Sequence, residues 1–231
     1  KKVYSLLILA LVLTSSMKAQ TQFWSDNFED AGSPSSGSRV ASITEFISCT
    51  SPSLSYFKRT TGAEISPIVF TNFSGSKFWA AMDIDKGSGC GANNTISAGQ
   101  SITWSGINIA GKTGLSFRGL FGANSAASFQ GLPFLPSTDS MSIAYRINGG
   151  AWVKIVGVHC NDNTASGGTM GFDLNGDRIG DGGAHTLGNA LSEISANITG
   201  TGTTLDLRFN IFVNNQHPGA MAFDNFRLYS S

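Results

Sequence analysis

Residues 141–158 read MSIAYRINGGAWVKIVGV, and this stretch decides the fold class. From Met141 to Ile147 apolar residues alternate with polar or small ones, and a second run follows from Trp152 to Val158. A period of two buries one side of a strand and solvates the other, which is typical of antiparallel sheets. Asn148-Gly149-Gly150 separates the runs and is a hairpin turn signal, because Asn and Gly tolerate positive φ. The stretch therefore predicts a β-hairpin.

The same alternation recurs along the chain, in residues 101–104 and again in residues 204–213. Gly is abundant at 28 residues, and 13% of the side chains are charged, about half of the ~25% in an ordinary domain. Only Leu187–Ile198 has a helical spacing. We therefore predict an all-β, antiparallel β-sandwich of jelly-roll or concanavalin A-like form with at most one short helix.

The first 19 residues have the pattern of a secretory signal peptide. Lys1 and Lys2 precede the apolar run Leu6–Leu13, and small and polar residues follow up to Ala19. The run is far shorter than the ~20 residues of a spanning helix, so an N-terminal membrane anchor is the weaker alternative. We expect cleavage after Ala19, one β-sandwich domain over residues 20–231, and a secreted or cell-surface protein without membrane insertion.

The charge balance excludes one class of partner. The chain carries 15 basic and 15 acidic residues, and loss of the leader removes Lys1, Lys2 and Lys18, which leaves a net charge of −3. A nucleic-acid-binding protein would show a basic excess, so we expect no nucleic-acid partner. An aromatic content of 10% also excludes a disordered chain.

Catalytic signatures are missing. The chain has four Glu residues and no E-x-D-x-x-E pattern, no G-x-S-x-G elbow and no phosphate-binding loop. The three histidines, His159, His185 and His217, are scattered, and we expect them at the surface or in loops. These observations predict a non-enzyme, with a hydrolase of unrecognised type as the alternative.

An acidic segment, DLNGDRIGD at residues 173–181, predicts a cation site. Asp173, Asn175, Asp177 and Asp181 place oxygen atoms at relative positions 1, 3, 5 and 9, and Ca²⁺ needs 6–8 oxygen ligands. Arg178 stands where an EF-hand loop has Gly. The alternative is a solvated turn whose Asp and Asn side chains bond their own backbone.

A second cation site is predicted where the chain ends meet. Asp26 and Glu29 open the mature chain and Asp224 lies close to its end. The first and last strands of jelly rolls often pair, so these carboxylates would approach each other and a bound Ca²⁺ would neutralise them. Hydrogen bonds to turn backbone are the alternative explanation.

Three cysteines, Cys49, Cys90 and Cys160, remain in the exported chain. An oxidising compartment predicts one disulfide and one remaining thiol, and the sequence leaves all three pairings open.

Five short motifs in order carry a family resemblance: WSDNFE (24–29), FWAAMDID (78–85), INGGAW (147–152), DRIGDG (177–182) and AFDNF (222–226). Together they resemble secreted β-sandwich modules of Bacteroidetes, similar to concanavalin A-like and jelly-roll adhesion or carbohydrate-binding domains. The resemblance implies export, often by type IX secretion.

Exposed aromatic rings bind sugars on such modules, and neighbouring polar groups take the hydroxyls. Trp152, Trp79 and Tyr145 are the candidate rings and Asn215 a candidate rim residue, with core packing as the alternative for each ring. We expect Trp152, which follows the hairpin turn, to be partly exposed. The sequence thus predicts a calcium-stabilised module that binds a polysaccharide or surface glycan. A self-associating structural subunit or spacer of a surface assembly is the alternative.

Overall fold

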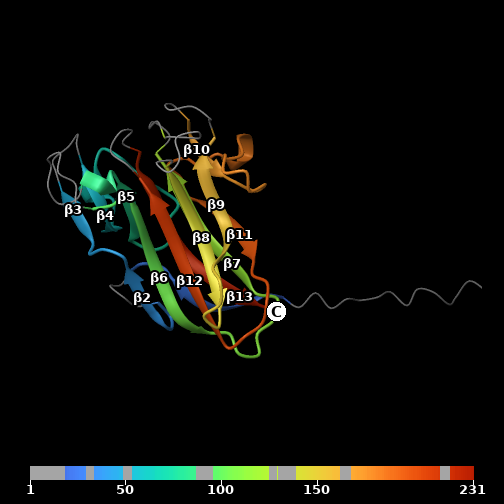
Figure 1. Cartoon of the computed structure of the whole chain (residues 1–231). Coiled ribbons are helices and arrows are strands. Elements are labelled where there is room, and N and C mark those ends of the chain that lie inside the picture. Colours follow the sequence, from blue (N-terminus) through green and yellow to red (C-terminus); the bar gives the residue numbers. More distant parts are fainter. Residues whose placement is uncertain are drawn as a thin grey trace, which may run out of the picture.

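Two antiparallel β-sheets pack face to face in the computed structural model, which describes residues 19–29, 34–48, 54–86, 96–124, 129, 139–161, 168–213 and 219–231 (Figure 1). Every pairing between named strands is antiparallel. The predicted antiparallel β-sandwich is therefore confirmed. Residues 1–18 of the predicted signal peptide lie outside the described residues, as do Cys49 and Cys90.

The seven-stranded sheet is organised around its longest strand, β13. Its members, in spatial order, are β11 (Ser192–Asn197), β7 (Ser116–Ala123), β13 (Met221–Ser230), β5 (Phe78–Met82), β4 (Ser55–Thr60) and β3 (Phe46–Ser48), with β1 (Thr21–Asp26) also on β13. One side of β13 pairs with β7, and the other pairs first with β5 and then with β1. The first and last strands that the structure describes therefore pair, as expected from the sequence.

The six-stranded sheet faces the viewer in Figure 1 and contains the predicted hairpin. Its order is β10 (Met170–Phe172), β9 (Val153–Cys160), β8 (Ser140–Ile147), β12 (Thr204–Phe212), β6 (Gly99–Asn108) and β2 (Ser38–Ala41). Between β8 and β9, Asn148 and Gly149 have φ of 49° and 72°, and Gly150 N–H donates to the Ile147 carbonyl at 2.9 Å. Two positive φ values in a two-residue loop match the right-handed twist of the strands, which is why this turn closes the hairpin.

The helix predicted at Leu187–Ile198 is wrong. Ser192–Asn197 forms β11, which pairs with β7, and Ile194 and Ala196 pack on the core while Glu193 and Ser195 point away. Pairing along the edge of β7 outweighs the weak helical spacing, because a strand gains its stability from its neighbours.

Within the described residues the helices are short 3₁₀ turns of three residues: η1 (Ala63–Ile65), η2 (Ile84–Lys86) and η3 (Gly183–His185). No helix in this part of the chain has the length and apolar character needed to cross a membrane.

The core between the sheets is built on aromatic rings, and Phe28 lies at its centre. The Phe28 ring contacts Trp79, Trp104, Phe223 and Phe226 edge-to-face, with centroids 5.5–6.1 Å apart. Phe28 follows β1 and has a φ of 58°, an unusual backbone for a bulky residue. The strained residue is tolerated because its ring fills the space that four other rings leave between the two sheets.

A buried carboxylate, Asp26, holds this arrangement in place. Both oxygens of Asp26 accept from Arg39 Nη1 at 2.8 Å, and one accepts from the indole N–H of Trp104 at 2.7 Å. The other oxygen accepts the backbone N–H of Phe28 at 2.9 Å. Because Asp26 ends β1 while Arg39 and Trp104 belong to β2 and β6, this carboxylate joins the two sheets.

Replacing Asp26 with Ala should lower the free energy of unfolding by about 3–5 kcal/mol, because it leaves the buried Arg39 guanidinium and Trp104 N–H without their acceptor. Urea unfolding of the domain measures this loss. The control is Glu193→Ala at the solvent-exposed Arg227–Glu193 ion pair, where we expect about 1 kcal/mol or less. Equal losses in the two variants would contradict a central role for Asp26.

Candidate functional site

The outer face of the six-stranded sheet carries a row of polar side chains along β12. Leu205, Leu207, Phe209 and Ile211 point into the core, so the alternate residues of β12 face outward. The outward residues are Thr204, Asp206, Arg208, Asn210 and Phe212. This strand lies between β6 and β8, and its outward side chains therefore stand in the middle of the face.

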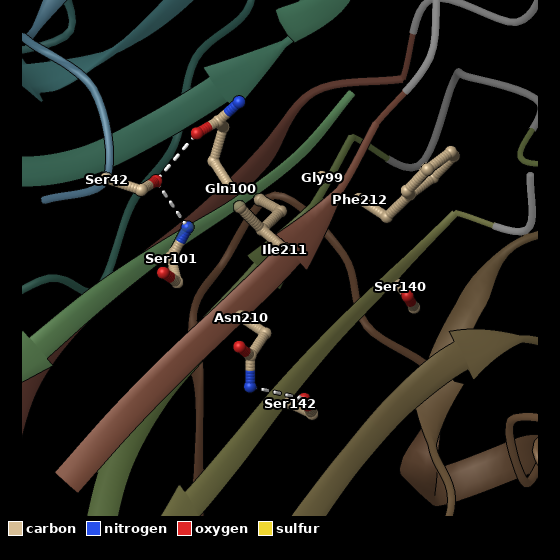
Figure 2. A pocket seen from close by; sticks show the side chains of 9 residues that line it. All are labelled: Ser42, Gly99, Gln100, Ser101, Ser140, Ser142, Asn210, Ile211 and Phe212. Carbon is tan, nitrogen blue, oxygen red and sulfur yellow. Dashed lines mark hydrogen bonds between the residues drawn. The ribbon is translucent and has the colours of Figure 1, made fainter. Parts of the chain in front are cut away.

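A pocket of about 350 Å³ opens on this face at the C-terminal end of β12 (Figure 2). It is lined by Ser42, Gly99, Gln100, Ser101, Ser140, Ser142, Asn210, Ile211 and Phe212. Asn210 Nδ2 donates to Ser142 Oγ at 3.3 Å. Ser42 Oγ donates to Gln100 Oε1 at 2.6 Å and accepts the Ser101 N–H at 2.8 Å. These bonds orient hydroxyl and amide groups around the pocket before any ligand arrives.

Phe212 is the aromatic residue of this pocket, and the sequence analysis missed it. In the sheet it pairs with Gly99 on β6 and with Ser140 on β8. A Cβ added at Gly99 would come 3.4 Å from Phe212 Cδ2, at van der Waals contact, so the Phe212 ring lies over β6 at this position. The half-buried ring therefore stands among small neighbours, as Figure 2 shows. The available signal was an aromatic residue in the solvent-facing phase of the alternation that predicted β12.

Trp152 lies on the same outer face and is half-buried, as expected for a residue that follows the hairpin turn. The guanidinium carbon of Arg208 is 4.0 Å from the Trp152 ring centroid and that of Arg146 is 4.7 Å away. Arg146 also donates from Nε to Asp206 Oδ2 at 2.8 Å. Trp152 thus acts in this structure as a platform for two arginines, and its role in ligand binding stays a prediction.

Two other predicted sugar-binding rings are buried. Trp79 is 1% exposed and packs against Phe57 and Phe223 in the core, so its proposed exposure is wrong. Tyr145 is 3% exposed, and its hydroxyl donates to the Thr199 carbonyl and accepts the Thr199 N–H. Both rings lie on the inward phase of their strands, where stacking on a sugar has no access. The fourth candidate, Asn215, lies outside the described residues.

The predicted surface position of the histidines is wrong for His159, which lies in β9 and is 8% exposed. Burial, followed by the charge of Lys154, lowers the pKa of its imidazole to about 4. His159 is therefore neutral near pH 7. His185, in η3, is exposed as expected, and His217 lies outside the described residues.

The acidic loop 173–181 uses its oxygen atoms on its own backbone. The two Asp173 oxygens accept the N–H groups of Gly176 and Arg178, Asp177 accepts that of Ile179, and Asp181 accepts that of Leu174. Asn175 accepts the N–H of Asp177. The alternative interpretation, a turn that bonds itself, therefore describes this loop. Among the described residues, no three His, Cys, Asp or Glu side chains are grouped to hold a metal ion.

The predicted approach of Asp26 to Asp224 involves two very different carboxylates. Asp26 is unsuited to a cation because Arg39, Trp104 and Phe28 take its oxygens. Asp224 is fully buried at the point where β13 leaves β5 and begins to pair with β1. Its Oδ2 accepts the Ser74 N–H at 2.6 Å, whereas Oδ1 has no hydrogen-bond partner.

The environment of Asp224 favours its protonated form. Burial is the largest cause and raises its pKa to about 7, helped by the charges of Glu29 and Asp26 and opposed by backbone hydrogen bonds from Ser74 and Asn225. The neighbouring Glu29 accepts the N–H groups of Ser76 and Lys77. Asp224 thus combines full burial with one oxygen that accepts no hydrogen bond.

Comparison with known proteins finds distant structural neighbours. No family model and no curated protein sequence matches this chain. Among solved structures, TmCBM61 in complex with β-1,4-galactotriose is 9% identical, with a TM-score of 0.39, over 81% of this chain and 88% of that one.

Two further carbohydrate-binding modules cover 92% of this chain, each with a TM-score of 0.41. The CBM22-1 xylan-binding domain from Paenibacillus barcinonensis Xyn10C is 9% identical over 97% of its length, and the mannan-recognising TmCBM27 is 11% identical over 99%.

Asp224 should make the fold less stable as the pH rises. With a folded pKa of about 7 and an unfolded pKa of ~3.9, the folded state holds a proton that the unfolded state releases between these values. The contribution of Asp224 to the free energy of unfolding should therefore fall by up to ~1.4 kcal/mol per pH unit from about pH 4 to pH 7. Urea unfolding in EDTA, compared with Asp224→Asn, measures this slope. A variant with the same slope as the parent protein would contradict the assignment.

Proposed function

We propose that this protein is a secreted, non-catalytic module for carbohydrate binding or cell-surface adhesion, and that it binds a polysaccharide or surface glycan on the outer face of the six-stranded sheet. One observation carries the proposal. The half-buried ring of Phe212 stands beside the hydrogen-bonded Asn210–Ser142 pair in an open pocket on an otherwise polar face.

This combination suits a sugar because a pyranose has two kinds of surface. Its C–H faces are apolar and stack on an aromatic ring, whereas its hydroxyls require donors and acceptors at the edge. Phe212 supplies the ring. The Asn210 amide, two residues before it on β12, and the Ser142 hydroxyl supply polar groups on the same face. Along β12 the outward residues from Phe212 to Arg208 extend ~14 Å, which gives a linear site open along the strand.

The residues that line the pocket support binding over hydrolysis. Retaining and inverting glycosidases use two carboxyl groups on either side of the bond that is cleaved. The described residues lining this pocket include serines, Gln100 and Asn210 and no carboxylate. The hydrolase alternative therefore has no support at this site.

Truncating the pocket should weaken glycan binding without affecting the fold. We expect Phe212→Ala and Asn210→Ala each to weaken binding by about tenfold or more, which corresponds to ~1.4 kcal/mol. A glycan array identifies the ligand, and titration calorimetry then compares the variants. The control is Val69→Ala, at an exposed apolar residue outside the named strands.

Two outcomes would contradict this function. Absence of binding to any glycan, with and without Ca²⁺, removes the binding proposal. Concentration-dependent self-association in size-exclusion runs without ligand would instead favour the structural subunit.

We also propose that Ca²⁺ stabilises the fold, with Asp224 as its ligand. The support is the unused, buried Oδ1 of Asp224 beside the ionised Glu29. Burying a carboxylate costs free energy unless a positive charge compensates it, and a bound cation would do so. The loop 173–181 is the second place predicted for an ion.

Calcium should raise the melting temperature at pH 7.5, because a ligand that binds only the folded state stabilises it. Thermal melts in excess Ca²⁺ and in EDTA measure the shift. We expect Asp224→Asn to abolish it and Asp177→Asn to preserve it. The reverse result would move the ion to the loop, and identical melts of the parent protein in both buffers would contradict a structural ion.

A further inference from the structure

The arginine at the centre of the outer face, Arg208, is partnered by a ring and a hydroxyl, and it forms no ion pair with any carboxylate of the described residues. Its Nε donates to Thr103 Oγ1 at 3.3 Å, and its guanidinium carbon lies 4.0 Å from the Trp152 centroid. Among the described residues, the cation in each ion pair of this face is Arg146 or Lys154, not Arg208. Arg208 therefore retains an uncompensated positive charge on the surface.

Two more cations lie around it. Arg208 pairs in the sheet with Ala144, which pairs in turn with Lys154, so the small alanine separates the two cations in one row. Lys154 is 3.7 Å from Asp173, a buried carboxylate that already accepts two backbone N–H groups. Arg146 completes the group, and its charge is compensated by Asp206.

Trp152 positions the guanidinium groups. An arginine stacked on an aromatic ring keeps its plane fixed and loses less conformational freedom on binding than a free side chain. Its remaining N–H donors form a rigid fork, a geometry that matches the two oxygens of a carboxylate or a sulfate. The structure thus holds a preorganised donor of the kind that binds acidic groups.

This donor is continuous with the pocket of the proposed function. Arg208 and Asn210 are successive outward residues of β12, and Thr103 and Ser101 stand beside them on β6. A chain of sugars that stacks on Phe212 and bonds Asn210 would therefore bring its next residues over Arg208.

We propose that the site selects an acidic polysaccharide, whose carboxylate or sulfate groups bind Arg208 while the hydroxyls of neighbouring residues bind in the Asn210–Ser142 pocket. The inference rests on the proposed function and deepens it by naming the substrate class. The whole chain has a formal net charge of 0, so a general attraction to polyanions does not explain such binding.

The competing explanation is that Arg208 only covers Trp152. A covering arginine would affect the stability of the domain and leave the discrimination between charged and neutral glycans unchanged. Specificity between matched ligands therefore separates the two roles.

The test is affinity electrophoresis and calorimetry of the full domain with two matched pairs of polymers. Polygalacturonate is compared with its fully methyl-esterified form, and κ-carrageenan with its desulfated form. We expect the acidic member of at least one pair to bind about tenfold more tightly or better, since a hydrogen bond to a charged group contributes ~1.5–3 kcal/mol. Binding to one pair alone identifies the anion as carboxylate or sulfate.

Variants locate the effect. Arg208→Gln should abolish the preference for the acidic polymer, and Arg208→Lys should restore it only in part because lysine lacks the planar fork. The matched control is Arg118→Gln, since Arg118 is stacked on Tyr229 at 4.7 Å but belongs to the other sheet. Raising NaCl from about 0.01 M to about 1 M shortens the Debye length from ~30 Å to ~3 Å and should weaken binding of the acidic polymer.

Other outcomes separate the inference from the proposed function. Equal binding of charged and neutral polymers, with loss in Phe212→Ala, would overturn the inference and leave the glycan site intact. Acidic preference unchanged in Arg208→Gln would likewise overturn it. Failure of every glycan to bind, on the polymers and on the array, would remove both.

Discussion

The hydrogen bonds of the buried Asp26 carboxylate link the two sheets, and the packing of the core follows from them. A buried charge is costly unless it is paired and hydrogen-bonded, and Asp26 of the seven-stranded sheet meets this condition through Arg39 and Trp104 of the six-stranded sheet. The same carboxylate fixes the backbone of Phe28, whose ring fills the centre of the core. One residue at the end of the first strand therefore sets the position of β2, the orientation of Trp104 and the packing of the aromatic cluster.

The outer face of the six-stranded sheet follows from that packing. Because the inward residues of β12 pack in the core, the alternate residues of this strand face solvent in a fixed order. Small neighbours then decide which large side chains remain accessible: Gly99 and Ser140 flank Phe212, and Ala144 leaves space between Arg208 and Lys154. The candidate site is thus a consequence of cross-strand register as much as of the site residues themselves.

The acidic residues divide by the range of their contacts. In the loop 173–181 the side chains bond backbone groups within seven residues, so the loop is stable by its local sequence. Asp224 instead depends on Ser74, which is 150 residues away in the chain, and keeps one oxygen unused. The polar side chains of a local turn find hydrogen-bond partners within their own segment. A carboxylate that lies where three strands meet depends on the tertiary structure for its partners.

We expected the first and last strands to pair because this is common in jelly rolls. The sequence predicted most of the strands and the hairpin at Asn148-Gly149, because period-two alternation and turn chemistry involve residues close in the chain. It could not decide which aromatic residues are accessible. Trp79 lies in the apolar strand β5 and points between the sheets, whereas Phe212 ends the alternating strand β12 and points out over Gly99. The sequence also indicated a helix where β11 forms, since β7, the strand that pairs with β11, is distant in the sequence. Only the tertiary structure brings Arg208, Trp152 and Lys154 together, because their proximity results from the register of three strands, which no single segment encodes.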